Sequence, residues 1–224
     1  MTVALDYADK IAVVRLGEDE NRFSPTFLDD IDDALNQAVS DGAQGLITTA
    51  GGKFYSNGLD LEWLGAHTDQ GKWYIGRVHQ LLARMLTLPL PTAAAVVGHA
   101  FGAGAMLAVA HDFRVMRADR GYFCFPEVDI RIPFNPGMAA PIQAKLTPRA
   151  AVASMTTGRR FSGPDAEQFG IVDATCPEDA VTDTALDLVR PLQGKDPGTL
   201  GAIKQTMFEH AVRALIDDED GAKS

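Results

Sequence analysis

The chain has 224 residues, of which 46% are hydrophobic, and its formal net charge at pH 7 is −10. This length suits one or two domains with a sizeable core. Because no basic run is longer than Arg159-Arg160, the composition argues against nucleic acid and anionic membrane surfaces as partners. No apolar run reaches the roughly 18 residues that a membrane-spanning helix needs, so no membrane segment is expected.

Sequence signals bear on the compartment as well. The first ten residues lack the basic and apolar regions of a secretory signal, and Ala222-Lys223-Ser224 differs from the S-K-L peroxisomal signal. Cys124 and Cys176 have no metal-type spacing and require no disulfide framework. The sequence therefore predicts a reduced, cytoplasmic protein that binds no metal.

The chain is predicted to alternate strands with amphipathic helices and then to end in helices, which is typical of an α/β layered domain. Ser24 and Pro25 are the N-cap and first-turn residues of the first helix, and Pro89 stops the third. In chain order, the expected elements are strands at 3–7 and 11–16, a helix at 25–41, a strand at 46–49, helices at 61–64 and 72–88, a strand at 92–97, a helix at 105–110, strands at 113–116 and 122–125, an extended or turn segment at 127–133, helices at 136–144, 148–157 and 163–169, a strand at 171–175, helices at 182–189 and 199–215, and a frayed tail at 217–224.

The most informative stretch runs from Val96 to Asp112. An apolar strand is followed by Gly102-Ala103-Gly104 and then by an apolar helix. The first N–H groups of a helix have no partner inside the helix and lie at the positive end of its dipole. Since no side chain of this turn is reactive, its expected function is to stabilise negative charge on an oxygen through backbone donors.

A second corner of the same kind lies some forty residues earlier. The segment 54–60 follows an apolar strand and leads into a predicted helix that Asp60 is expected to cap. Two such corners could direct two N–H groups to one oxygen. The alternative is that both are ordinary tight turns that simply require glycine.

These corners resemble the two oxyanion motifs of the crotonase (enoyl-CoA hydratase/isomerase) family, at residues 54–61 and 97–104. Residues 158–173 resemble the segment that follows in the family, so the resemblance runs nearly end to end. It implies a crotonase (ClpP-like) α/β spiral of β-β-α turns, with a core at 1–190 and a helical oligomerisation region of the same domain at 191–224. A homotrimer or a dimer of trimers is the implied assembly.

The resemblance also implies an acyl-CoA thioester substrate and no cofactor, with CoA entering only as part of the substrate. The implied oxyanion donors are the backbone N–H groups of Leu59 and Ala103. Arg22 and Lys53 are the candidate cations for the CoA phosphates, although both could simply be solvated. The other implied substrate-binding residues are Phe54, Ser56, Asn57, Gly58, Gly102 and Met106.

One position distinguishes the reactions of this family. Its hydratases use two glutamates, and the first of those positions is occupied here by Met106, which cannot transfer a proton. The second position is retained as Glu127, after Pro126. A single carboxylate implies isomerisation of 3-enoyl-CoA to 2-trans-enoyl-CoA, with Glu127 as the proton shuttle. The segments 21–25, 48–53, 117–121 and 127–130 resemble Δ3,Δ2-enoyl-CoA isomerases of the plant type.

Several alternatives remain open at this point. The protein could be a hydratase, could catalyse another crotonase reaction, or could bind acyl-CoA without catalysis. Glu127 could be a solvent-facing turn residue, and Asp129 is the rival carboxylate. His99 lies closest to the second corner, where packing is the simpler interpretation. Met106, Trp63, Leu64 and Phe134 could form an apolar acyl tunnel, or could belong to the core.

Overall fold

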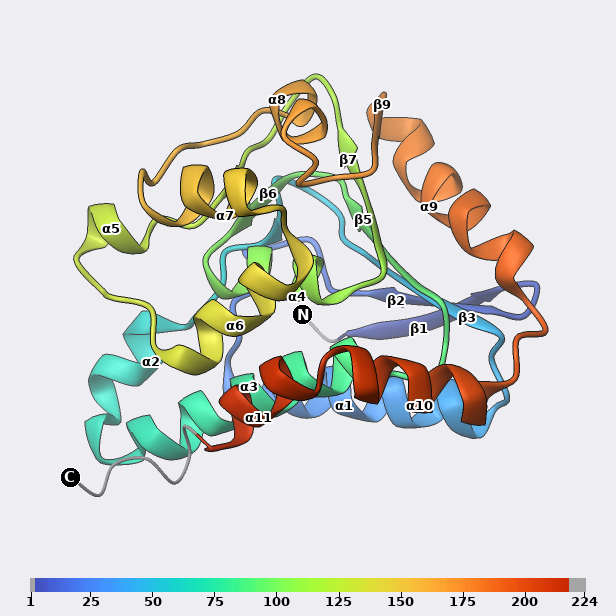
Figure 1. The fold of residues 1–224 in the computed structure, drawn as a ribbon, viewed down its shortest axis with the longest axis horizontal. Helices are drawn as coiled ribbons and strands as arrows, with labels where there is room; N and C mark the ends of the chain where they lie inside the picture. The colour runs from blue at the N-terminus through green and yellow to red at the C-terminus, as the bar shows by residue number, and fades with distance from the viewer. Residues whose placement is uncertain (1–2, 218–224) are drawn as a thin grey trace.

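The computed structural model describes residues 3–217, which form the spiral of β-β-α turns that the sequence predicts (Figure 1). Three consecutive units each contribute one strand to a large sheet, one strand to a small sheet, and at least one helix. The elements are β1 Ala4–Ala8, β2 Ile11–Arg15, α1 Pro25–Ser40, β3 Gly45–Thr49, β4 Phe54–Ser56, α2 Leu61–Ala66, α3 Gly71–Thr87, β5 Thr92–Val96, β6 His99–Phe101, α4 Ala103–Ala110, β7 Phe113–Arg117, β8 Phe123–Cys124, α5 Glu127–Ile130, α6 Pro136–Lys145, α7 Pro148–Met155, α8 Gly163–Gln168, β9 Ala174–Cys176, α9 Val181–Val189, α10 Pro197–Met207 and α11 Glu209–Asp217, with short 3-10 turns at 68–70, 178–180 and 190–192.

The large sheet has the strand order β1-β2-β3-β5-β7-β9 and is parallel except for the antiparallel pair β1-β2. The small sheet is parallel, in the order β4-β6-β8. Since successive units add strands in the same order to both sheets, the ends of β4 and β6 become neighbours. The two corners that follow these strands are therefore brought together by the topology.

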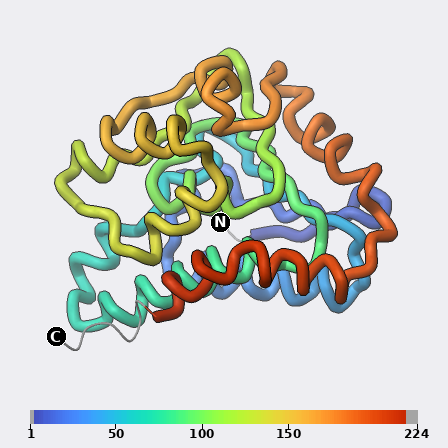
Figure 2. The backbone as a smooth tube through the Cα atoms, viewed as in Figure 1, coloured from blue at the N-terminus to red at the C-terminus, as the bar shows by residue number. Residues whose placement is uncertain are grey.

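Helices cover both faces of the large sheet, and the period of two along its strands decides which side chain meets which helix. On β2, Ile11 and Val13 belong to the core cluster shared with α9. Ala12 and Val14 point the other way, into the larger core that includes α1, α3 and α4. The backbone trace shows α9 alone on one side of the sheet (Figure 2).

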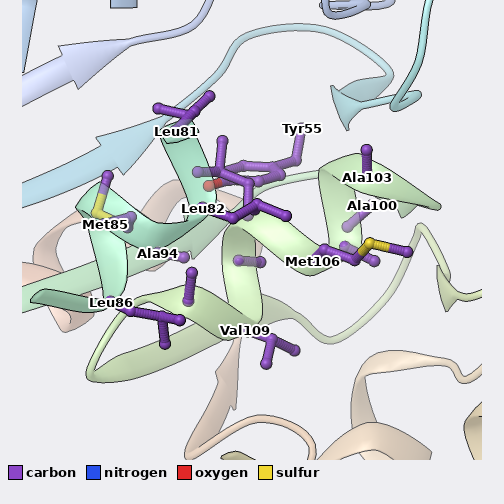
Figure 3. Close-up of a cluster of buried hydrophobic side chains, with 14 of the residues drawn as sticks. Tyr55, Leu81, Leu82, Met85, Leu86, Ala94, Ala100, Ala103, Met106 and Val109 are labelled. Carbon is purple, nitrogen blue, oxygen red and sulfur yellow. The ribbon is translucent and has the colours of Figure 1, made fainter. Parts of the chain in front are cut away.

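The helix α4 lies at the centre of the larger core, and every one of its residues is buried. Small residues such as Ala94 on β5 leave room for this helix to pack between the sheet and α3. Figure 3 shows Met106 of α4, Leu82 of α3 and Tyr55 of β4 among the buried side chains of this core. An all-round apolar helix of this kind can be stable only as a buried element, and its first turn is thereby fixed in place.

The structure corrects several local predictions. The segments expected as loops contain β4 and β6, and Glu127–Ile130 forms the short helix α5 where an extended or turn segment was expected. The last strand begins at Ala174, three residues later than predicted. The single helix expected at 199–215 is interrupted at Phe208, between α10 and α11. Of the predicted tail, residues 218–224 lie outside the described part of the chain.

Candidate active site

Two corners of the chain, at the ends of β4 and β6, are locked together by close backbone packing. Gly58 has a φ of +80°, and a Cβ added there would lie 2.9 Å from the backbone nitrogen of Ala103. A Cβ added to Gly104 would lie 2.6 Å from the Oγ of Ser56. Real Cβ atoms do not approach other atoms this closely, so both contacts require glycine. The two corners therefore form one rigid unit.

This unit presents two free backbone donors. Leu59 and Ala103 line the same cavity. Ala103 is the first residue of α4, so its N–H has no acceptor inside the helix. Neither N–H donates a hydrogen bond to another residue within 3–217. Both donors are therefore available to an oxygen of a ligand, and the helix dipole of α4 favours negative charge there.

Asn21 holds the first corner from behind. Its Nδ2 donates to two carbonyls of β4, each at 3.1 Å, and its own carbonyl accepts from the Oγ of Ser56 at 2.7 Å. That same Oγ accepts from the N–H of Gly58 at 3.1 Å. Asn21 is not among the site residues predicted from the sequence. Its φ of +49°, which asparagine tolerates better than most residues, is a signal that only the structure reveals.

Glu127 lies against the second corner. It is the first residue of α5 and follows Pro126. A Cβ built on Gly102 would lie 3.7 Å from the Oε1 of Glu127. Since Gly102 directly precedes Ala103, the carboxylate and the second backbone donor are close neighbours. A substrate carbon next to a carbonyl bound at the corner would therefore lie near the carboxylate.

The environment of Glu127 is unusual for a carboxylate. Only 7% of the residue is exposed, and its Oε2 has no hydrogen-bond partner among the described residues. Burial raises the pKa of Glu127 from 4.5 to about 7, partly offset by a hydrogen bond to its own backbone. A carboxyl group with this pKa can both accept and return a proton at neutral pH.

The cavity beside Glu127 has a volume of about 470 Å³. This volume lies in the range of small-molecule binding pockets. Its wall is mostly apolar, and Glu127 is the one acidic side chain among the described lining residues. The lining residues are Arg22, Asn57, Leu59, Leu61, Leu64, Ile75, Phe101, Gly102, Ala103, Met106, Pro126, Glu127, Ile130, Ile132, Pro133, Asn135 and Met138.

The structure distributes the predicted substrate-binding residues unevenly. Arg22, Asn57, Gly102 and Met106 line the cavity together with Leu59, Ala103 and Glu127. Phe54, Ser56, Gly58 and Lys53 lie outside its lining. Ser56 is wholly buried behind the first corner, and the Nζ of Lys53 lies 5.2 Å from the ring of Phe54.

The apolar wall of the cavity also differs in part from the acyl tunnel that the sequence predicted. Leu64 and Met106 line the cavity, whereas Trp63 and Phe134 pack against the core behind it. Ile75, Asn135 and Met138 also belong to the wall, although none of them was predicted to line it. Asp129 is exposed and is absent from the lining of the cavity, so it is not the rival carboxylate there.

Two further expectations concern metal binding and membrane-spanning helices. Within residues 3–217, no group of three or more His, Cys, Asp or Glu side chains is arranged to bind a metal ion. No helix in the same range combines the length and apolar character needed to cross a membrane. The cytoplasmic location and the absence of a cofactor stay predictions.

A spiral of β-β-α units with paired backbone donors and a buried carboxylate at the same cavity defines an enzyme of the crotonase class. The chain belongs to the enoyl-CoA hydratase/isomerase family, whose sequence model matches residues 6–222.

Relatives from Arabidopsis thaliana carry similar sequences. Enoyl-CoA delta isomerase 3 is 37% identical over 199 residues, which cover 84% of this chain and 82% of the relative. The peroxisomal enoyl-CoA delta isomerase 1 is 31% identical over 229 residues, covering 99% and 95%. The chain thus aligns along almost its whole length with isomerases of the plant type.

Solved structures share the fold. A probable enoyl-CoA hydratase from Mycobacterium tuberculosis superimposes with a TM-score of 0.91 at 25% identity, covering 99% of this chain and 94% of that one. The human mitochondrial delta3-delta2-enoyl-CoA isomerase superimposes with a TM-score of 0.88 at 23% identity, covering 98% and 88%. The likeness to the human enzyme concerns the fold alone.

Proposed function

We propose that the protein isomerises 3-enoyl-CoA thioesters to 2-trans-enoyl-CoA thioesters. The observation that carries the proposal is the carboxylate of Glu127, buried in an apolar cavity with one oxygen unpartnered. Two free backbone N–H groups lie at the same cavity. The names of the Arabidopsis relatives, enoyl-CoA delta isomerases, support the same class of reaction.

The reaction begins when the thioester carbonyl oxygen accepts hydrogen bonds from the N–H groups of Leu59 and Ala103. Glu127 then removes a proton from C2, and the electrons of the broken C–H bond move into a dienolate whose charge rests largely on that oxygen. Such preorganised donors stabilise developing charge, and loss of one typically costs about 3–4 kcal/mol.

The second half of the reaction returns the same proton. Glu127, now protonated, gives it to C4, the double bond moves between C2 and C3, and the thioester carbonyl is restored. One carboxyl group suffices for both steps if it lies over one face of the substrate. The pKa of about 7 allows Glu127 to act as a base first and as an acid afterwards.

The composition of the cavity favours isomerisation over hydration. Addition of water across a double bond needs groups that hold and split the water, and family hydratases use two glutamates for this. Here Met106 lines the wall and Glu127 is the one acid among the described lining residues. A thioether is only a weak acceptor, so it cannot activate water in place of a carboxylate.

The proposal is tested with purified protein and 3-trans- and 3-cis-hexenoyl-CoA, following the ultraviolet absorbance of the conjugated thioester. We expect an absorbance rise that falls about 10³-fold or more in Glu127→Gln. The matched control is Asp129→Asn, which removes an exposed carboxylate two residues along the chain and should keep its rate.

A parallel assay with 2-trans-hexenoyl-CoA measures hydration. Hydration as fast as isomerisation would contradict the proposal and favour a hydratase. Tight binding of CoA esters without turnover of any enoyl isomer would instead indicate a binding protein.

We also propose that the protein assembles as a homotrimer or a dimer of trimers. On α10, Ile203 is 55% exposed and Met207 is 70% exposed. Exposed apolar side chains on one helix are a frequent feature of subunit contacts. Size-exclusion chromatography with light scattering checks the assembly, and a monomer at working concentration would contradict it.

A further inference from the structure

A second cavity is lined by α10, the end of α6 and the segments that begin β5 and β7. Its volume is about 360 Å³, and none of its described lining residues lines the cavity beside Glu127. We name it the lysine cavity, because Lys145, Lys195 and Lys204 line it, with Asp112 as the one acidic side chain among the described lining residues. It is therefore a candidate binding site separate from the active site.

The acidic group of the lysine cavity is already paired. The Oδ2 of Asp112 accepts from the Nζ of Lys204 at 2.6 Å and from the N–H of Thr92 at 2.8 Å. Lys204 and Asp112 therefore compensate each other's charge. The positive charges of the other two lysines remain, in a chain whose net charge is −10.

Lys145 is the more enclosed of these two lysines. It is the last residue of α6 and is half-buried, whereas Lys195 is exposed. The Nζ of Lys145 lies 5.2 Å from the ring centre of Phe208, and it forms neither a hydrogen bond nor a salt bridge with another residue in the range 3–217. An ammonium group withdrawn from water without an anionic partner carries a desolvation cost. An anion bound beside it would reduce that cost.

The groups around Lys145 leave its surroundings positive. The charged groups that act on it are Arg114, Asp112, Lys204 and Asp173. Burial, and then the charge of Arg114, lowers the pKa of Lys145 to about 8. The nearby His111 adds no charge at neutral pH, because burial lowers its pKa to about 3. This environment disfavours the ammonium form and favours an anionic ligand that would stabilise it.

The remaining wall of the lysine cavity is mostly apolar. Leu192, Leu200, Ile203, Met207 and Phe208 contribute to it. Ile203 and Met207 are exposed in the single chain, so the cavity can be reached from one side. A small hydrated anion gains nothing from such a wall, whereas an aliphatic chain gains up to about fourfold in affinity for each CH₂ group that it buries. The cavity therefore suits a ligand that joins a carboxylate to an aliphatic chain.

We propose that the lysine cavity binds a free medium-chain fatty acid. Its carboxylate pairs with Lys145, with Lys195 as a second cation at the rim, and its chain lies along α10 against Ile203 and Met207. The same two apolar side chains belong to the face proposed above for subunit contacts, so the bound fatty acid would lie at the edge of that contact. The site goes beyond the proposed isomerase reaction and does not depend on it.

The test is calorimetric titration of the whole protein with octanoate. We expect Lys145→Met to raise the Kd at least tenfold, and Lys145→Arg, which keeps the charge, to change it less than about threefold. The matched control is Lys72→Met, which removes an exposed lysine of α3 and should change the Kd less than twofold. An unchanged Kd in Lys145→Met would place octanoate elsewhere, and an equal rise in Lys72→Met would show a mere effect of net charge. Either result would overturn the proposal.

A ligand series on the wild-type protein tests both ends of the fatty acid. From butanoate to octanoate the Kd should fall with every added CH₂ group, by up to about fourfold each. Acetate and 1-octanol should each bind at least tenfold more weakly than octanoate. Octanol binding as tightly as octanoate would mean that the cavity recognises no charge, and acetate binding as tightly would mean that it recognises no chain. Both outcomes contradict the assignment.

Proton uptake gives a further readout that is specific to Lys145. A bound carboxylate raises the pKa of this lysine from about 8, so binding at pH 8 should take up about half a proton. Titrations in two buffers of different ionisation enthalpy measure this uptake, which should be absent in Lys145→Met. Proton release would contradict the proposed pairing. Failure of octanoate to bind the assembled wild-type protein would show that a second subunit fills the cavity, and would overturn the proposal whether or not the protein is an isomerase.

Discussion

Two of the buried charged side chains in the described part of the chain, Lys204 and Glu127, differ in how they are hydrogen-bonded. Lys204 on α10 is only 4% exposed. Its Nζ donates to the carbonyl of Leu90 at 2.7 Å and to the Oδ2 of Asp112 at 2.6 Å. The same Oδ2 accepts from the N–H of Thr92 at 2.8 Å. Glu127 is buried to a similar degree, yet its Oε2 has no partner within the described residues.

The comparison separates a structural charge from a functional one. A buried charge that is hydrogen-bonded ties elements together, here α10 to the segment that begins β5 and to Asp112, two residues after α4. A buried carboxylate left without partners costs stability, and such groups persist where chemistry needs them. The contrast in hydrogen bonding, more than the burial itself, indicates which of the two groups acts on a substrate.

The largest expected effect is on the structural charge. Lys204→Met should lower the free energy of unfolding by about 3–5 kcal/mol, because it leaves Asp112 without its cation. The control is Lys195→Met, an exposed lysine at the edge of the same helical region, which should change stability by no more than about 0.5 kcal/mol. Urea denaturation measures both variants. Equal losses of stability would contradict the structural role given to Lys204.

Removal of the charge of Glu127 should have the opposite effect on the free energy of unfolding. With a folded-state pKa raised from 4.5 to about 7, the native protein holds a proton that the unfolded chain releases between these pH values. Wild-type stability therefore falls as pH rises through this window. Glu127→Gln should be nearly neutral at pH 4.5 and stabilising by up to about 3 kcal/mol at pH 8. A destabilised variant at pH 8 would mean that Glu127 has partners in solution.

The same pKa governs the pH dependence of the proposed reaction, but kcat/KM should rise with pH where stability falls. Glu127 must be ionised to take the first proton, so kcat/KM should rise with pH and level off above an apparent pKa of about 7. Below that value we expect about a tenfold fall per pH unit. A profile measured with 3-hexenoyl-CoA that stays flat down to pH 5 would exclude Glu127 as the base.

The smallest expected effect concerns a carboxylate that lies one residue from an oxyanion donor but has a partner. The Oδ1 of Asp60 accepts from the N–H of Trp63 at 3.0 Å and caps α2. Asp60→Ala should cost about 1 kcal/mol of stability, with Asp60→Asn as the control that keeps a capping oxygen. A rate loss comparable to that of Glu127→Gln would contradict the comparison, because it would give a catalytic role to a carboxylate that already has a hydrogen-bond partner.

The sequence predicted those parts of the site that depend on local chemistry. Glycine-containing turns after apolar strands indicated both corners, and resemblance to a family motif identified Glu127. The short strands β4 and β6 were missed because three residues are too few to show a period of two. The segment after Pro126 was expected to be an extended or turn segment, since Pro126 ends the strand before it. Proline restricts the residue before it, whereas the residues after it remain free to form a helix.

The wall of the cavity was the least predictable part. Ile75 comes from α3, Met138 from α6, and Asn135 from the residue that caps α6. Their helical spacing gives a buried face but does not say which part of that face meets a cavity. Trp63 and Phe134 were expected in the wall for the same reason, and tertiary packing placed them behind it. Such assignments depend on contacts between distant elements.

The interlocked corners have a consequence for how this molecule can change. Their donors belong to the main chain, so a substitution of the Leu59 or Ala103 side chain leaves both N–H groups in place. Only a change that alters the backbone path, such as a side chain added at Gly58 or Gly104, can remove them. The two backbone donors proposed to stabilise an enolate are thus insulated from most single mutations, while Glu127 and Met106 can vary. A chain built in this way can exchange one proton-transfer reaction for another while both backbone donors stay in place.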